Sequence, residues 1–407
     1  MGDTGHATPT TALGRLAARV NPNVDEYLWN RSRNREMAQL VEATLTAGPL
    51  PSPRLRADRE AHVVVIPMDG PERDTYRPAG GNFFFEIAQA AREYAGDAKV
   101  SVFCVEPGEP SSSWHRRLAL YLGEVGATHL IAQVEKDPAG NPEWTWDALW
   151  AALLPVWDGV FLGTMFDSSY RWLTIPVRRM ARMSDRFMLV DICMPMDGQL
   201  VKGRPEVGPV NMPMSTQALG IIDETAAGRP KIHDVTFIGA LYPYRVALIE
   251  SLEAAGLRVS VNPHRIDAPH DLEGSRANQP TYVDYMVALA QSHMTINFSQ
   301  SSAGPYQQLK TRVLEASAMG CLVLTDDVDR TERFWVKGVE FDHFSAPEEL
   351  PALVASWLGD PARLAAGQAA AKDRARSMNS SAFWGGIDAG LARRGLPAIG
   401  AATSGMG

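Results

Sequence analysis

A basic pair and a carboxylate lie close together in the segment PYQQLKTRVLEASAMGCLVLT, residues 305–325. Lys310 and Arg312 supply positive charge, and a guanidinium can bind a phosphate through two N–H donors. Glu315 shares a helical face with Arg312, and a carboxylate there can accept hydrogen bonds from both hydroxyls of a ribose. A surface Arg–Glu pair without function, contributing about 0.3 kcal/mol, is the alternative. The apolar residues around them favour a buried helix, where unpaired charges are costly.

The segment DVTFIGALYPYR, residues 234–245, could supply further ligand contacts. Its apolar strand ends at Gly239, where the missing side chain lets the backbone approach a ligand closely. Arg245 opens the next helix, whose N-terminus favours anions, and Tyr242 lies between the two. A tight turn at Gly239 with a solvated Arg245 would explain the same residues without a ligand. The motif is not G-x-G-x-x-G, so it does not indicate a dinucleotide site.

Polar residues also follow other strands of this half. Ser299, Ser301 and Ser302 lie in the loop SQSSAGP, whose hydroxyls and backbone amides could bind phosphate or sugar oxygens. His264 follows an earlier strand, where a nucleobase could lie, although a lone loop histidine is usually just exposed. The string DDVD at 326–329 contains a D-x-D pattern of metal-dependent enzymes. That pattern is common by chance, and basic residues can neutralise a diphosphate, so we expect no metal site and no tightly bound cofactor.

Alternating strands and helices must position these residues. From AHVVVIPMDG at residues 61–70 to RFMLVDICM at 186–194, short apolar strands alternate with helices. The breaker-rich segment 194–232 interrupts the alternation, and a second series begins at Asp234. Continuous apolar strands separated by helices predict parallel sheets covered on both faces. We therefore expect an α/β protein with two Rossmann-like, doubly wound domains that face a cleft at the carboxyl ends of their strands.

The same breaks predict four parts of the chain. An N-terminal helical extension occupies residues 1–60, and the first Rossmann-like domain occupies 61–215. The second domain occupies 216–385. A tail at 386–407 could pack back on the first domain.

The composition limits the classes of function. The 407 residues carry a net charge of -8, which argues against a general nucleic-acid binder because phosphate-backbone affinity needs clustered Lys and Arg. Cys104, Cys193 and Cys321 lie far apart in apolar runs, which favours buried thiols in a reducing compartment. No stretch reaches the ~18 apolar residues of a membrane span, and the N-terminus lacks a signal-peptide core. We therefore expect a cytoplasmic enzyme.

The segments DVTFIGALYPYRVALIESLEAAGLRV and LKTRVLEASAMGCLVLTDD resemble the donor-binding half of GT-B glycosyltransferases. The resemblance is to the "glycosyl transferases group 1" type of spore-maturation-protein-like enzymes and covers roughly residues 234–376. That group has a K-x-R-x-x-E-x-x-x-x-G pattern, which Lys310, Arg312, Glu315 and Gly320 reproduce. The resemblance implies an enzyme that transfers a sugar from a nucleoside diphosphate sugar to a glycan or small-molecule acceptor.

The resemblance also implies roles for single residues. Lys310 would bind the departing diphosphate, together with Arg245 or Arg312. Glu315 would bind the ribose, and the turn at Gly239 would lie at the phosphates. Of these residues, Lys310 would contribute most directly to catalysis.

One position departs from the family pattern. Many retaining relatives carry two glutamates with seven residues between them, and Gln307 occupies the first of these positions here. We expect a metal-independent, retaining transferase. A non-catalytic nucleotide-sugar-binding protein with the same fold, or a nucleotide-sugar epimerase or phosphorylase, is the alternative. A dehydrogenase is disfavoured because no glycine-rich fingerprint follows either first strand.

The acceptor would lie at the loops that follow strands of the first domain. Asp69 is the candidate general base that activates the acceptor hydroxyl. In that role its carboxylate would have to lie within about 3 Å of the hydroxyl. Gly80, Gly81 and Asn82 follow in the same loop, before a helix. Asp167 follows a later strand, where it could contact the acceptor or cap the next helix.

Overall fold

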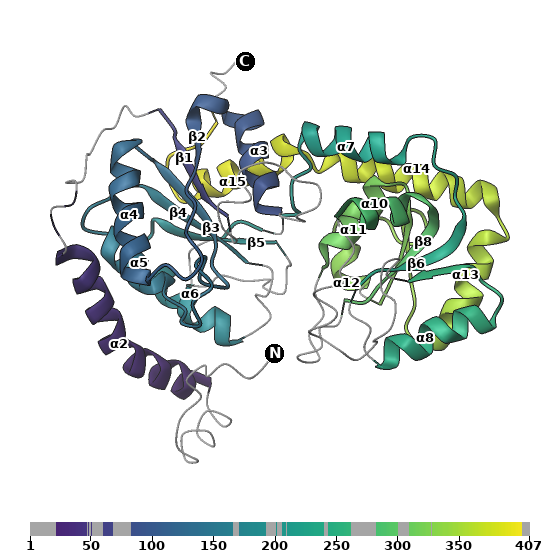
Figure 1. The fold of residues 1–407 in the computed structure, drawn as a ribbon, viewed down its shortest axis with the longest axis horizontal. Helices are drawn as coiled ribbons and strands as arrows, with labels where there is room; N and C mark the ends of the chain where they lie inside the picture. Colours follow the sequence, from purple (N-terminus) through teal and green to yellow (C-terminus); the bar gives the residue numbers. More distant parts are fainter. Residues whose placement is uncertain are drawn as a thin grey trace.

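The chain forms two α/β halves, each built on a five-stranded parallel sheet (Figure 1). The computed structural model describes residues 22–46, 48, 50, 60–67, 83–165, 171–192, 201, 206–208, 210–239, 243–261, 282–299, 309–326 and 328–400. All neighbouring strands in both sheets pair in parallel. The predicted class, two doubly wound parallel sheets, is confirmed.

The first sheet has the strand order β2-β1-β3-β4-β5. Successive side chains of a strand point to opposite faces. Accordingly, Val63 and Val65 of β1 join one apolar cluster, and Val64 and Ile66 join another. Helices therefore cover both faces, which explains why most residues of the strands are apolar. The strands are β1 (Val63–Ile66), β2 (Val100–Val102), β3 (His129–Gln133), β4 (Val160–Met165) and β5 (Phe187–Asp191).

Helices of the first half divide between these two clusters. Trp114, Trp150 and Val177 pack on one face, whereas Ile87 and Ile387 pack on the other. The last of these belongs to the C-terminal helix α15 (Ser380–Arg393), which returns from the second half (Figure 1). The other helices are α2 (Pro22–Thr46), α3 (Phe83–Ala95), the 3-10 turn Asp97–Lys99, α4 (Ser111–Glu124), α5 (Trp146–Leu153) and α6 (Arg171–Met183).

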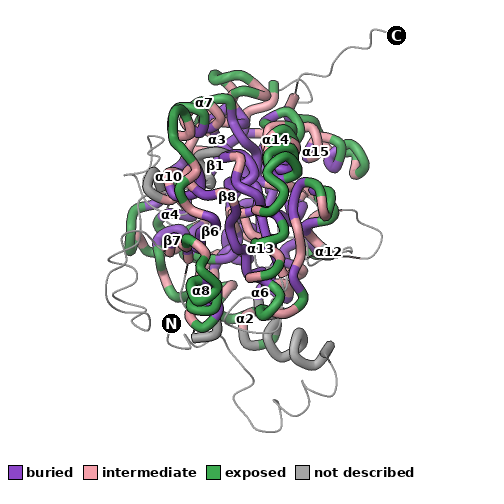
Figure 2. The backbone as a smooth tube through the Cα atoms, turned by 90° about the vertical axis from the view of Figure 1, so that its right-hand side faces the viewer, coloured by how far each residue is buried: buried purple, intermediate pink, exposed green. Residues whose placement is uncertain are grey.

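The second sheet has the order β10-β9-β8-β6-β7, so both halves arrange their successive strands in the same way. Its central strands are buried while the surrounding helices expose their outer sides (Figure 2). The edge strand β10 was missed by the sequence analysis because it is only three residues long and two of them are polar. The strands are β6 (His233–Phe237), β7 (Val259–Val261), β8 (Ser292–Asn297), β9 (Leu322–Thr325) and β10 (Phe341–His343).

The helices of the second half agree with the predicted alternation except for α7 (Thr216–Ala226), which lies in the segment 194–232 that was expected to be a linker. Ser215 caps this helix by accepting from the Ala218 amide. The helices of this half end in a helical run that leads from the sheet toward the first half (Figure 1). The elements are α7 (Thr216–Ala226), α8 (Pro243–Ala254), α10 (Tyr282–Ala290), α11 (Thr311–Ala318), α12 (Val328–Thr331), the 3-10 turn Pro347–Glu349, α13 (Leu350–Leu358) and α14 (Pro361–Ser377).

The chain passes between the halves at two places that lie side by side. The Met214 amide donates to the Met378 carbonyl at 2.8 Å, just before α7 and α15 begin. One carboxylate of the first half, Glu93 on α3, accepts from both helix starts. Its Oε1 accepts from the Thr216 amide at 2.8 Å, and its Oε2 accepts from the Ser380 hydroxyl at 2.5 Å. Glu93 therefore ties both crossings to α3.

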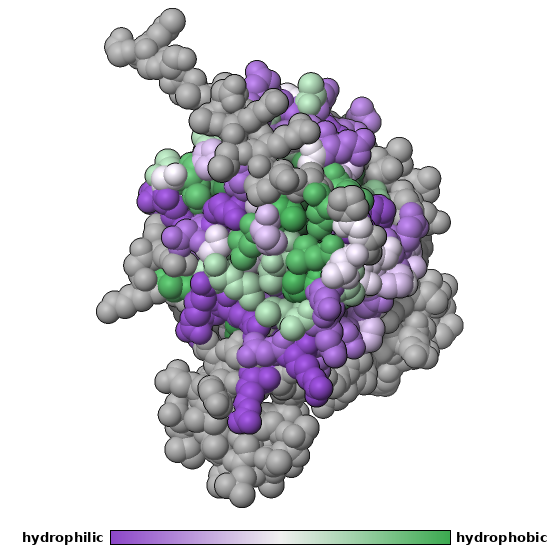
Figure 3. Space-filling view, turned by 90° about the vertical axis from the view of Figure 1, so that its left-hand side faces the viewer, coloured by the Kyte–Doolittle hydropathy of each residue, from purple (hydrophilic) through white to green (hydrophobic). Residues whose placement is uncertain are grey.

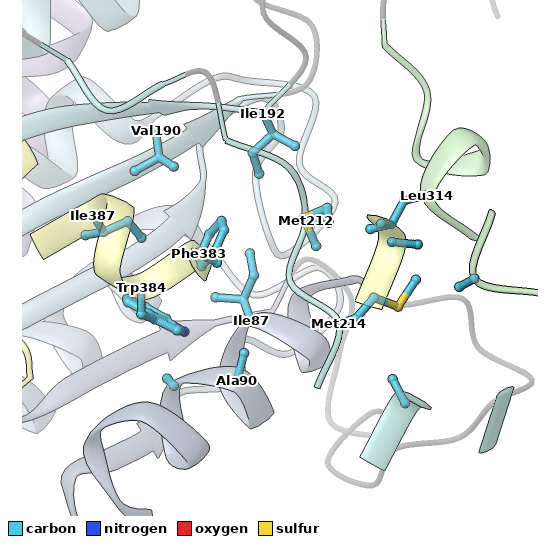
Figure 4. Close-up of a cluster of buried hydrophobic side chains, with 14 of the residues drawn as sticks. Ile87, Ala90, Val190, Ile192, Met212, Met214, Leu314, Phe383, Trp384 and Ile387 are labelled. Atoms are coloured by element: carbon cyan, nitrogen blue, oxygen red, sulfur yellow. The ribbon is translucent and has the colours of Figure 1, made fainter. Parts of the chain in front are cut away.

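An apolar cluster supports these crossings (Figure 4). Ile87 of α3 and Phe383 of α15 pack with Met214 of the first crossing, and the same cluster continues to Leu314 of α11. The cluster therefore spans both halves without interruption. Farther along α15, Asp388 binds residues 399 and 400 by accepting hydrogen bonds from both of their amides. It also accepts from the Tyr94 hydroxyl of α3 at 2.8 Å.

A buried ion cluster attaches α2 to the outside of the first half. Asp147, fully buried at the start of α5, lies 3.4 Å from Arg33 of α2 and 3.6 Å from Arg179 of α6. Burial raises the pKa of Asp147, and the two guanidiniums partly offset this effect. Without these partners the buried carboxylate would carry a large desolvation penalty. The ion pairs of Arg33 and Arg179 with Asp147 therefore hold α2 and α6 against α5.

The surface and the thiols of the described ranges complete the description. None of the helices in these ranges has the length and apolar content that a membrane span requires. The outer side of the first half shows apolar residues near its middle and hydrophilic ones around them (Figure 3). Burial raises the pKa of the Cys321 thiol to about 12. Cys104 is only half-buried, contrary to expectation, because it follows the edge strand β2; Cys193 lies outside the described residues.

Replacing Glu93 by Gln should loosen both crossings. A glutamine offers one acceptor oxygen, whereas Glu93 accepts two hydrogen bonds on two oxygens and places negative charge at two helix N-termini. We expect a loss of about 1 kcal/mol of stability, or roughly 2 °C in melting temperature. Glu224→Gln, on the exposed surface of α7, is the matched control and should melt like the wild type. Equal melting of the two variants would contradict the role given to Glu93.

Candidate functional site

The predicted ligand residues of the second half gather where its strand order reverses. Ligands of open parallel sheets bind outside the carboxyl ends of the strands, where neighbouring strands connect in opposite directions. In this sheet that point lies between β6 and β8. Gly239 follows β6, and Ser299 follows β8. The topology thus places the two predicted loops at adjacent strand ends.

Two guanidinium groups lie over one pair of aromatic rings at this point. The Arg245 guanidinium is 5.7 Å from the ring centre of Phe237 and 4.9 Å from that of Phe298. The Arg312 guanidinium is 5.5 Å from the Phe237 ring. Cation–π contacts of this kind contribute about 0.5–2 kcal/mol each and offset part of the repulsion between the two cations. Arg245 is only 7% exposed, so the alternative of a solvated first-turn arginine is wrong.

Gly239 allows Arg312 to approach the end of β6. Its φ of +153° lies in a region that side-chain-bearing residues rarely adopt. A Cβ atom at this position would lie 2.9 Å from the Arg312 Nη2 atom. The positive φ therefore favours glycine, and a side chain here would also force the Arg312 guanidinium to shift.

Glu315 is buried and hydrogen-bonded rather than part of a surface pair. It is 4% exposed, and its Oε2 accepts from the Tyr285 hydroxyl at 2.7 Å. Burial, followed by the charge of Glu315, raises the pKa of Tyr285 well above its usual value. The hydroxyl also hydrogen-bonds with Arg312, whose buried Nε has no partner among the described residues. The alternative of an exposed Arg–Glu pair is therefore wrong.

Lys310 and Gly320 lie outside the helix that the sequence placed around them. Helix α11 begins at Thr311, and Lys310 is its half-buried N-cap residue with extended backbone angles. Gly320 follows the helix end with a φ of +64°. The helix is shorter than expected, since it extends only from Thr311 to Ala318. Lys310 therefore stands at a helix N-terminus, where anions are favoured.

Ser299 has a structural partner. Its amide and its hydroxyl both donate to Asp326 Oδ1, at 2.6 and 2.5 Å, and this residue opens the DDVD string. Asp326 thereby joins the ends of β8 and β9. In the described ranges no group of acidic, His and Cys side chains has the arrangement of a metal site.

Several predicted contacts cannot be placed in the structure. The residues that lie outside its described ranges are Asp69, Gly80, Gly81, Asn82, Asp167, Tyr242, His264, Ser301, Ser302 and Gln307.

Some site residues were missed by the sequence analysis. Tyr285 lies in the helix YVDYMVALA, which also contains Tyr282 and Asp284, so no signal in that stretch distinguished it. Phe237 and Phe298 read as ordinary strand residues, and only the fold places them beneath the arginines. In the first half, the buried Glu135 follows β3 and accepts from Gln133, at the strand end where that sheet reverses its order.

Comparisons with known proteins agree with this geometry. Residues 245–382 match the model of a family described as glycosyl transferase-like. This match covers part of the second half, and it makes that part similar to glycosyltransferases. The matched stretch begins at Arg245 and contains Tyr285, Arg312 and Glu315, whereas Phe237 and Gly239 precede it. No curated protein sequence matches the chain.

Solved structures of the GT-B fold superpose on both halves of this chain. Sucrose-phosphate synthase from Thermosynechococcus elongatus superposes with a TM-score of 0.53 at 11% identity, covering 82% of this chain and 98% of that one. Anabaena HepE, solved in complex with UDP, superposes with a TM-score of 0.51 at 12% identity, covering 82% and 100%. At these identities the likeness shows the GT-B fold alone.

Gly239→Ala should destabilise the second half. The new methyl group must displace Arg312 and adopt a strained backbone, so we expect a cost of roughly 2–3 kcal/mol in urea denaturation. Gly256→Ala is the matched control, because this glycine also has a positive φ but no atom lies within 4 Å of its added Cβ. The control should cost about 1 kcal/mol. A cost at Gly239 no larger than at Gly256 would show that Arg312 is not held against the turn.

Proposed function

We propose that the protein transfers a sugar from a nucleoside diphosphate sugar to an acceptor. The proposal is based on the convergence of Arg245, Arg312 and Glu315 beside the Gly239 turn. Two cations held close together in an acidic chain favour an anionic ligand such as a diphosphate. A neighbouring buried carboxylate favours a ligand with hydroxyl groups, such as ribose. A nucleoside diphosphate combines both features.

We infer that the basic side chains stabilise the leaving diphosphate. As the bond between the sugar and the diphosphate breaks, negative charge grows on the phosphate oxygens. Arg245, Arg312 and Lys310 at the start of α11 would neutralise that charge with prepositioned donors. This role makes a metal ion unnecessary. The proposed retention of the sugar's configuration is supported only by the resemblance to retaining relatives.

We place the acceptor at the first half. Both sheets share one strand order, so the strand ends beside β1 and β3 correspond to those that carry the donor residues in the second sheet. The proposed acceptor residues follow two strands in the sequence: Asp69, Gly80, Gly81 and Asn82 come after β1, and Asp167 comes after β4. UDP is the first donor nucleotide to test, because the HepE structure of the same fold contains it.

A thermal-shift screen tests the donor site. UDP, GDP, ADP, CMP and dTDP, with their sugars, are compared, and one nucleotide family should raise the melting temperature. A ligand at a hundredfold excess over its Kd stabilises the native state by about 2.7 kcal/mol. Lys310→Ala and Glu315→Gln should each remove most of this shift while keeping the ligand-free melting temperature.

Lys337→Ala, which changes an exposed lysine of the same half, is the matched control and should keep the full shift. Absence of a shift with every nucleotide would overturn the proposed donor site. Binding without transfer or hydrolysis would favour the non-catalytic alternative.

A further inference from the structure

Tyr285 connects the proposed diphosphate side of the site to the proposed ribose side. It comes from α10, which packs beside α11, and its hydroxyl donates to Glu315 Oε2 at 2.7 Å. The same hydroxyl hydrogen-bonds with Arg312. A phenol can do both at once, because its oxygen accepts from the guanidinium while its proton goes to the carboxylate. One hydroxyl therefore joins the cation to the carboxylate.

A phenylalanine would serve equally well as packing. The ring of Tyr285 packs against the cluster that contains Leu289 and Leu314, and this contact needs no oxygen. A hydroxyl in such surroundings costs free energy unless it is hydrogen-bonded. The presence of oxygen at this position is therefore explained by its two polar partners rather than by the core.

The direction of the hydrogen bond is defined by the ionisation of the pair. Burial and the charge of Glu315 raise the pKa of Tyr285, so the phenol keeps its proton around neutral pH. A protonated phenol beside an ionised carboxylate must act as the donor. The bond consequently holds one oxygen of Glu315 in a defined direction, which limits rotation of the carboxylate plane.

We propose that Tyr285 is a positioning residue that orients Glu315 for recognition of the ribose hydroxyls. The inference rests on the proposed function, because it presumes that Glu315 faces a nucleotide. Tyr285 acts through Glu315 and need not touch the ligand itself. Its loss should therefore impair discrimination between ribose and 2′-deoxyribose more than it impairs binding of the diphosphate.

The test compares UDP with 2′-deoxy-UDP, or the corresponding pair for the diphosphate that the screen selects, by isothermal titration calorimetry. The wild type should prefer the ribonucleotide by about 10- to 100-fold, the range expected for hydrogen bonds to a charged group. In Tyr285→Phe this ratio should fall to within about threefold. General damage to the fold would weaken both ligands alike and leave the ratio unchanged.

Tyr94→Phe is the matched control. It removes a hydrogen bond from a tyrosine hydroxyl to a carboxylate, that of Asp388, in the first half and should leave the ratio as in the wild type. If Tyr285→Phe does not fold, Tyr285→Met removes the hydroxyl with a side chain that adapts to irregular space. A ratio in the Tyr285 variants equal to that of the wild type would overturn the inference while leaving the proposed function intact. A wild type that binds none of the diphosphates would overturn the proposed function together with the inference. A wild type that binds UDP and 2′-deoxy-UDP equally would overturn the inference alone.

Discussion

The approach of two guanidinium groups to the Phe237 ring is the interaction around which the proposed site of the second half is built. Arg245 and Arg312 both lie within 6 Å of the Phe237 ring, and Arg245 is almost fully buried. Two cations placed this close cost free energy in a protein interior unless something compensates them. The aromatic faces and the Tyr285 hydroxyl supply part of that compensation. The arrangement is therefore compatible with the anionic ligand that we propose.

The parallel sheet provides the place for this arrangement. Because neighbouring strands β6 and β8 continue into helices on opposite faces, their carboxyl ends leave room between the connections. The strand β6 ends in Phe237 and a glycine turn, and α8 starts just beyond with Arg245 as its third residue. Arg312 enters from α11, which follows β8. The strand order therefore brings α8 and α11, which are distant in sequence, close enough for Arg245 and Arg312 to contact the same Phe237 ring.

Much of the fold could be predicted from the sequence, and the reason is periodicity. Buried parallel strands must be apolar on both faces, so runs such as VVVI and LVLT are visible without a structure. The strand β10 escaped because three residues carry no periodic signal. For the site, charged residues near strand ends were visible, but their partners were not. Tyr285 contacts Glu315 only because α10 packs against α11, and side-chain contacts between helices are not encoded in the spacing of either one.

The contacts of the proposed donor site all come from one half of the molecule. Phe237, Arg245, Tyr285, Arg312 and Glu315 lie between the first strand of the second sheet and the end of α11. The first half contributes none of the described contacts among them. Its connection to the second half runs instead through Glu93 and the apolar cluster around Met214. Donor recognition is therefore built locally, whereas transfer to an acceptor bound by the other half would depend on how these two crossings hold the sheets relative to each other.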